Sequence, residues 1–238
     1  AASDVYKRQD DSLSGAEALI RWNSRKYGFI GPNTFIPLLE DSALIIPLGR
    51  WIINTAAKAC NRWITSIPDF VMHINLSFVQ IVKSNIVKDV LENIERYSAA
   101  NNHYVFEITE TIEMDQIPAV QNVFKEFVKN EFRFAIDDFG TGYSNYGYMR
   151  DRTFDIVKVD RSFVTDIDKL KDNYLMVSFI IKMAHEMGLH VCIEGVETKE
   201  ELSCVKKLGA DYIQGYYYGK PVCLQDFEEQ HLKRFVLG

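Results

Sequence analysis

The apolar positions of the chain alternate, from Ser14 onward, between short continuous runs and longer stretches with a helical period. The short runs are rich in β-branched and aromatic residues and end in polar residues, which is typical of strands. The expected strands are Ala16–Arg21, Phe70–Asn75, Tyr104–Ile108, Arg133–Ile136, Asp155–Val159, His190–Ile193 and Tyr212–Ile213. The expected helices are Leu44–Thr65, Val79–Ala99, Ala119–Lys129, Asp172–Met187, Lys199–Leu208 and Leu224–Phe235.

Strands that alternate with helices predict a parallel sheet, and eight such strands would close it into an α/β barrel. Seven strands are visible, so the missing one is expected before Ser14. Because Asp10–Gly15 is too short for a crossover helix, that strand should return as a hairpin and lie antiparallel to the next. The chain shows no Pro/Gly/Ser-rich linker and no internal repeat, so residues 10–238 are expected to form one domain.

Polar residues also mark the starts of two expected helices. Asp166 or Asp168 is expected to cap the long fifth helix. Thr198, followed by Glu200 and Glu201, predicts a second capped start. Both helices are therefore expected to begin with a side chain that binds free backbone N–H groups.

The first nine residues differ from the rest of the chain. Ser3–Gln9 resembles a translated transposase-adapter sequence from library preparation, so residues 1–9 are predicted to be a non-native leader. On that hypothesis the first, antiparallel strand of the barrel is truncated or replaced. The loss of this strand would expose the edge of its neighbour and lower the stability of the domain.

Composition and charge exclude some classes of protein. A net charge of −6 at pH 7 argues against a broad basic surface for a nucleic-acid polymer. The most hydrophobic stretch, Ala43–Ala57, contains Pro47, Arg50 and Asn54, so no membrane contact is expected from this domain. The four cysteines are scattered without a CxxC pair, which fits a reducing compartment and predicts a cytoplasmic location.

Six of the seven expected strands carry, or are followed at once by, a carboxylate, a carboxamide or a lysine. These residues are Glu17, Asn75, Glu107, Glu110, Asp137, Asp138, Lys158, Asp160, Glu194 and Glu197. In a barrel the carboxyl ends of the strands meet at one mouth, where active sites are built. Gathered carboxylates repel one another unless cations neutralise them. Oxygen ligands with one amide suit Mg²⁺ or Mn²⁺ rather than Zn²⁺.

Each of these residues also has an ordinary explanation when it is taken alone. A single acid at a strand end, such as Glu107 or Glu197, is more often a solvated loop residue or a helix cap. Asn75 alone would be a turn residue, and Lys158 alone an exposed strand lysine. His73 is expected to be a packed strand residue rather than a ligand. The whole set at one barrel mouth nevertheless predicts a metal site.

Eight motifs, in order along the chain, resemble those of the EAL phosphodiesterases. They are Glu17–Trp22, Phe35–Glu40, Asn75–Ser77, Glu107–Glu110, Asp137–Ser144, Lys158–Val164, Glu194–Thr198 and Gln214–Tyr216. The EAL tripeptide alone recurs by chance, but eight ordered motifs are highly specific. The resemblance implies a TIM-like (β/α)8 barrel of the EAL type. It also implies metal-dependent hydrolysis of cyclic di-GMP to linear pGpG in bacterial second-messenger signalling.

The same resemblance implies a site with two ions, Mg²⁺ or Mn²⁺. Glu17, Asn75, Glu107 and Asp137 would hold one ion, while Asp137 would bridge to a second ion that Asp138 also binds. The catalytic groups would be Glu194, as metal ligand or general base for the water, and Lys158, which would orient that water. The implied substrate-binding residues are Arg21, Gln214 and Asp160.

Further residues are implied to act around the metal site. Glu110 would hold the loop after Asp138 by hydrogen bonds to its backbone, and Glu197 would belong to the residues that surround the site. Gly140 and Gly142 would give this loop its backbone freedom. In the family this loop links the metal site to the dimer interface, so a homodimer through the barrel is expected.

The chain departs from the family pattern at two places. The strand with a Gln-Pro pair that normally precedes the EAL motif is not visible, and Asn145-Tyr146 stands where Ser-Leu is usual. The main alternative to an enzyme is a catalytically silent EAL domain that binds cyclic di-GMP as a receptor. Because silent members usually lose acids of the metal site, the acids retained here favour the enzyme. A third hypothesis is a metal-dependent phosphodiesterase for another nucleotide.

Overall fold

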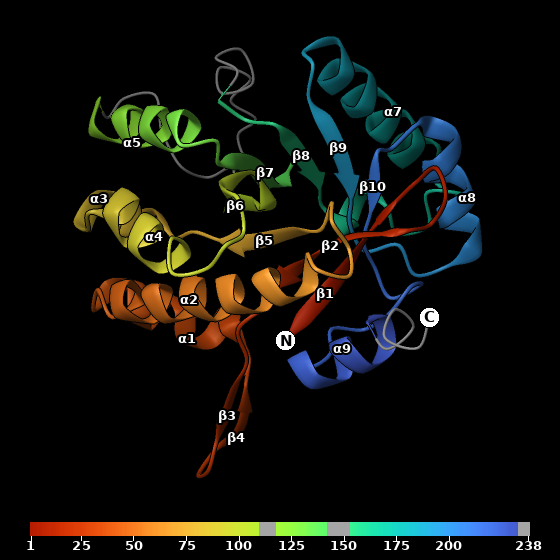
Figure 1. The fold of residues 1–238 in the computed structure, drawn as a ribbon. Coiled ribbons are helices and arrows are strands. Elements are labelled where there is room, and N and C mark those ends of the chain that lie inside the picture. Colours follow the sequence, from red (N-terminus) through yellow and green to blue (C-terminus); the bar gives the residue numbers. More distant parts are fainter. Residues whose placement is uncertain (110–117, 142–152, 233–238) are drawn as a thin grey trace.

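The computed structural model describes residues 1–109, 118–141 and 153–232 of the chain. Eight strands form a closed barrel with helices around it, in the order β1-β10-β9-β8-β7-β6-β5-β2 (Figure 1). The strands are β1 (Ala2–Lys7), β2 (Leu13–Ala18), β5 (Val71–Asn75), β6 (Tyr104–Thr109), β7 (Arg133–Phe139), β8 (Ile156–Val159), β9 (His190–Ile193) and β10 (Tyr212–Ile213). β1 is antiparallel to both neighbours, and the other pairs are parallel. The predicted barrel with an antiparallel first strand is therefore confirmed.

The sequence predicts that the first strand is truncated or replaced, and the expected loss of this strand, with an exposed edge on its neighbour, is wrong for this chain. Ala2–Lys7 form β1, in which Ser3 pairs with Glu17 of β2 and Tyr6 pairs with Ile213 of β10. Both edges next to β1 are thus hydrogen-bonded, and no neighbouring strand is left with a free edge. That residues 1–9 are a non-native leader stays a prediction.

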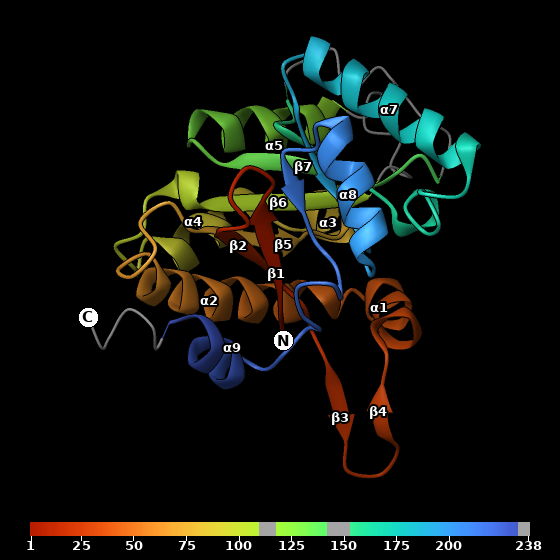
Figure 2. The same cartoon turned by 90° about the vertical axis from the view of Figure 1, so that its right-hand side faces the viewer.

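The helices cover the outside of the barrel or close its ends (Figures 1 and 2). They are α1 (Pro32–Asp41), α2 (Ile45–Trp63), α3 (Phe78–Lys83), α4 (Ile86–Ile94), α5 (Pro118–Lys129), α7 (Lys171–Glu186), α8 (Lys199–Leu208) and α9 (Leu224–His231), with short 3₁₀ turns η1 (Asn101–His103) and η3 (Arg161–Phe163). Among the described residues, no helix is both long and apolar enough to span a bilayer.

Two sequence predictions about helices are wrong. The single helix expected over Val79–Ala99 is broken into α3 and α4, because Ser84 is extended and the Asn85 side chain accepts the Lys88 N–H to start a new helix. The expected cap from Asp166 or Asp168 is not found among the described residues, since the N-cap residue of α7 is Leu170, whose side chain makes no capping hydrogen bond.

The cap expected at Thr198 is confirmed. Its Oγ1 accepts the N–H of Glu201, and the Glu201 carboxylate in turn accepts the N–H of Thr198. The same carboxylate also accepts the N–H groups of Glu197 and Asp166, so it fixes the segment between β9 and α8.

The stretch between β2 and α2 was not assigned from the sequence. It contains α1 and a hairpin of β3 (Trp22–Ser24) and β4 (Gly28–Ile30), which projects away from the barrel (Figure 2). Trp22 packs edge-on against Phe35 of α1. Tyr27 and Phe29 of the hairpin are exposed, which explains why this stretch lacks the pattern of a buried element.

The inside of the barrel is filled at one level by an apolar layer, the barrel floor. It consists of Val5, Val71, Val105, Ala135, Ile156, Cys192 and Tyr212. Since side chains alternate in a strand, the residues two positions further along each parallel strand, and two positions earlier in the antiparallel β1, also point inward. Those inward positions carry the polar residues of the candidate site.

Candidate active site

The inward positions beyond the barrel floor are occupied by polar and charged side chains from every strand of the barrel. They are Ser3, Glu17, His73, Glu107, Asp137, Lys158, Glu194 and Gln214. Each comes from a strand or from the residue directly after one, at the end where the parallel strands finish. The alternation of side chains along each strand, which buries the barrel floor, thus also places these polar groups at one mouth of the barrel.

Lys158 of β8 lies at the centre of four carboxylates, which we call the carboxylate cluster. Its Nζ is 2.7 Å from Glu194, 2.8 Å from Glu107, 3.1 Å from Asp137 and 3.8 Å from Glu17. The side chain is only 1% exposed, which excludes an ordinary solvated strand lysine. Burial lowers the pKa of Lys158, but the four carboxylates outweigh it and raise that pKa well above its usual value. The cluster therefore surrounds a buried ammonium.

Glu17 of β2 is held by two amides as well as by Lys158. Asn75 Nδ2 donates to one of its oxygens at 2.7 Å, and Gln214 Nε2 donates to the other at 2.9 Å. Burial favours the neutral acid, yet Lys158 and these hydrogen bonds prevail and lower the pKa of Glu17. Glu17 is thus a fixed carboxylate, as a hard cation requires.

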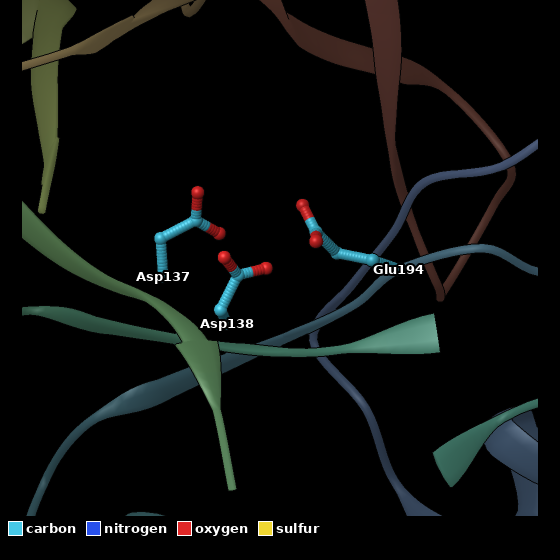
Figure 3. Close-up of side chains that lie close together, drawn as sticks. All are labelled: Asp137, Asp138 and Glu194. Atoms are coloured by element: carbon cyan, nitrogen blue, oxygen red, sulfur yellow. The ribbon is translucent and has the colours of Figure 1, made fainter. Parts of the chain in front are cut away.

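Asp137, Asp138 and Glu194 point toward one another at the mouth (Figure 3). One carboxylate oxygen from each lies within 4.8 Å of the others, an arrangement that can hold a metal ion. Asp138 adopts a positive φ of 53°, a strained conformation for a non-glycine residue. Burial raises the pKa of Glu194 to about 8. The Lys158 ammonium opposes this rise, whereas the negative charges of Asp137 and Glu17 add to it. These acids repel in the absence of a cation.

The donor set fits Mg²⁺ or Mn²⁺. Its members are carboxylates and one carboxamide, which are the hard oxygen ligands of these ions. Asp137 Oδ1 is buried and pairs with Lys158 only by charge, since it accepts no hydrogen bond of good geometry from the residues that the structure describes. Gln214 Oε1 is a second buried acceptor at the site that no donor of the described residues reaches. A cation at the cluster would satisfy these oxygens.

Three other predicted residues lie around this cluster. Arg21 is half-buried, and its Nη1 donates to the carbonyl of Ile20. Asp160 accepts the Ser162 N–H and so caps η3, while its charge helps to raise the pKa of Asp138, chiefly an effect of burial. Glu197 is exposed, in the segment that Glu201 fixes.

The loop predicted to begin at Asp138 is described only at its start. Gly140 has a φ of 96°, and a Cβ atom there would lie 2.8 Å from the ring of Phe163. Only glycine fits this backbone and this contact. Glu110 and Gly142 lie outside the described residues.

Sequence reasoning missed two residues that touch the site. His73 Nδ1 lies 2.8 Å from Glu107 Oε1, and burial lowers the pKa of His73 to about 3, so its ring is neutral. Ser3 Oγ accepts a hydrogen bond from Gln214 Nε2 at 2.9 Å. The alternation of Val71, His73 and Asn75 could have placed His73 inside the barrel. The prediction of a packed strand residue is right about burial but omits its partner.

A family model for the EAL domain matches residues 5–221. The chain belongs to the EAL domain family. In Escherichia coli (strain K12), the probable cyclic di-GMP phosphodiesterase PdeG is 32% identical over 223 residues, which is 93% of this chain and 44% of PdeG. The cyclic di-GMP phosphodiesterase PdeL of the same organism is 32% identical over 221 residues, which is 92% of this chain and 60% of PdeL.

Solved EAL structures share this barrel. The EAL enzyme Bd1971, in a form with bound cAMP and cyclic di-GMP, superposes with a TM-score of 0.91 and 34% identity over 96% of this chain and 63% of that chain. This chain therefore spans less than two thirds of the length of each of these three proteins. The predicted family and fold are both confirmed.

Proposed function

We propose that this EAL domain hydrolyses cyclic di-GMP to linear pGpG with two divalent cations, Mg²⁺ or Mn²⁺, in bacterial second-messenger signalling. The observation that carries the proposal is the carboxylate cluster together with Asn75 and Asp138. Every acid that the family motifs supply as a metal ligand is present, and these side chains lie at one barrel mouth. The names of PdeG and PdeL and the cyclic di-GMP bound to Bd1971 support the choice of substrate.

The first ion would be held by Glu17, Asn75, Glu107 and Asp137, and the second by Asp137 and Asp138. When bound, such a pair of ions stabilises the entering and leaving oxygens of an in-line displacement at phosphorus. Glu17 is already fixed by two amides, so little ordering is needed when an ion binds. Burial raises the pKa of Asp138 and of Glu194, and a bound cation would favour the ionised form of both, with any displaced proton released to solvent.

Glu194 and Lys158 would act on the attacking water. Glu194 lies within 4.8 Å of both Asp137 and Asp138, so it can take the proton of a water bound between them or ligate an ion itself. The Lys158 ammonium, 2.7 Å from Glu194, would orient this water and offset charge that develops on phosphate oxygens.

Substrate contacts would come from Arg21, Gln214 and Asp160. Arg21 lies three residues after the end of β2, and its guanidinium can bind a phosphate oxygen once it releases the Ile20 carbonyl. Gln214 has an oxygen without a donor and lies against Glu17. Asp160 caps the start of η3 and is close enough to Asp138 for its charge to raise the pKa of that residue. Glu110, Gly140, Gly142 and Glu197 would support the loops around these groups.

We also propose that the domain forms a homodimer through its barrel. α7 supports this because Leu175, Met176 and Phe179 on it are exposed, and apolar side chains gathered on one helix favour a protein interface. The cytoplasmic location expected from the composition stays a prediction.

Incubation of the purified chain with cyclic di-GMP, followed by ion-exchange chromatography, tests the proposed reaction. Turnover to pGpG is expected with Mg²⁺ or Mn²⁺ and not with EDTA. Binding of cyclic di-GMP without pGpG at any metal concentration would contradict an enzyme and favour the silent receptor. Faster turnover of a different nucleotide in a substrate panel would favour the third hypothesis.

A further inference from the structure

His73 lies inside the barrel between the barrel floor and the metal ligands. It follows Val71 of the floor by two residues and precedes Asn75 by two, so all three point inward from β5. The side chain is 5% exposed and that of Glu107 is fully buried. Their contact of 2.8 Å is therefore shielded from bulk water. A hydrogen bond is electrostatically stronger in such a buried environment than in water.

The chemistry of the two groups fixes which one donates. A carboxylate that binds a metal ion must be ionised, and an ionised carboxylate only accepts hydrogen bonds. Nδ1 of His73 must then carry the hydrogen and donate it to Glu107 Oε1. Lys158 Nζ lies 2.8 Å from the other oxygen, Oε2. Glu107 is thus held on both oxygens, by His73 from β5 and by Lys158 from β8.

We propose that His73 is a positioning residue of the metal centre, which holds the Glu107 carboxylate in the orientation that binds the first ion. The inference rests on the proposed function, because it assigns Glu107 as a ligand. Hydrogen bonds to ligating carboxylates set their orientation and strengthen metal binding, and loss of such a partner costs about 10- to 100-fold in affinity.

A purely structural role would make different demands on this position. If His73 only fills space above the floor, an apolar side chain of similar shape should serve equally well. Leucine and asparagine form a matched pair for this question. Asparagine places an N–H donor at the position of Nδ1, two bonds beyond Cβ, whereas leucine places a methyl group there.

Manganese binding to the whole chain, measured by calorimetry without nucleotide, tests the inference. We expect His73→Leu to weaken Mn²⁺ binding by about 10- to 100-fold. His73→Asn should restore most of the affinity of the unmodified chain. Thermal melts in EDTA should show that both variants are folded.

Equal Mn²⁺ affinity of His73→Leu and the unmodified chain would overturn the inference and leave the proposed function standing. Failure of the unmodified chain to bind Mn²⁺ would overturn both. If neither variant folds, the nitrogen NMR spectrum of His73 in the Mg²⁺-loaded unmodified chain decides the question. Hydrogen on Nδ1 supports the proposal, and hydrogen on Nε2 alone overturns it.

Discussion

The Nζ atom of Lys158 lies 2.8 Å from Oε2 of Glu107, and the two side chains are 1% and 0% exposed. A charge so deeply buried is tolerated only when it is paired, and three further carboxylates complete the pairing here. Lys158 therefore neutralises part of the cluster before any ion binds. Its removal should affect both stability and metal dependence.

Lys158→Met should destabilise the metal-free protein by about 3–5 kcal/mol, because buried carboxylates lose their counter-ion. Saturating Mn²⁺ should reduce this difference, since the cation supplies the missing charge. Urea unfolding of both proteins, in EDTA and in Mn²⁺, measures the effect. An equal loss of stability under the two conditions would contradict the assignment of the cluster as a cation site.

Glu17→Ala should reduce turnover of cyclic di-GMP by more than about 100-fold, which exceeds the loss expected for a residue that only supports a ligand. The substitution removes a proposed metal ligand and frees the amides of Asn75 and Gln214. Initial rates at saturating Mg²⁺ measure it, and a melting curve in EDTA checks that the variant is folded. Retained turnover would rule out this role for Glu17.

A contact at the opposite end of the barrel should make stability depend on pH. Asp211 Oδ2 accepts the Val191 N–H and lies 2.8 Å from His185 Nε2 and 3.8 Å from His190 Nδ1. Burial raises the pKa of Asp211, but these partners outweigh it and lower that pKa to about 2. The contact with Asp211 raises the pKa of His190.

The two shifts define a pH window. Because the pKa of Asp211 is lowered, this carboxylate stabilises the fold at pH values above its ordinary pKa of 3.8. The stabilisation is lost as the pH falls toward 2. The raised pKa of His190 stabilises the fold below 6.5, and this is lost as the pH rises through the folded value. The melting temperature of Asp211→Asn should therefore fall furthest below that of the unmodified chain between about pH 4 and 6.5. An equally large difference in melting temperature between the two proteins at pH 9 would contradict this prediction.

Val5→Asp should destabilise the domain by about 3–5 kcal/mol, because an unpaired carboxylate would be buried in the barrel floor. Val5 is 2% exposed and belongs to β1, so the substitution tests whether Ala2–Lys7 close the barrel. Gln9→Asp, in the exposed turn after β1, adds the same charge and is the matched control. Equal melting temperatures of the two variants would show that β1 is not part of the folded barrel.

Much of the barrel could be predicted because each buried strand carries its own apolar run and each run ends in polar residues. The expected strand over Tyr104–Ile108 differs from β6 by one residue, and the one over His190–Ile193 has the bounds of β9. β1 could not be predicted in the same way, since its place depends on pairing with β2 and β10. The break between α3 and α4 depends on a short polar cap at Asn85 within an apolar helical pattern.

The candidate site could be predicted as a set of strand-end residues but not as a set of contacts. Strand positions indicated that Glu107 and Lys158 would both lie at the mouth of one barrel. The central place of Lys158 follows from the registers of four other strands, which a sequence does not display. For the same reason the contact between His73 and Glu107, on adjacent strands, became visible only in the structure.

Crystals of this chain soaked in Mn²⁺ and cyclic di-GMP, with anomalous scattering recorded at the manganese edge, would test the central claim most directly. The account predicts two anomalous peaks at the barrel mouth, about 3.5–4 Å apart. One should lie among Glu17, Asn75, Glu107 and Asp137, and the other beside Asp138. A site with no manganese, or manganese bound only elsewhere on the protein, would contradict it.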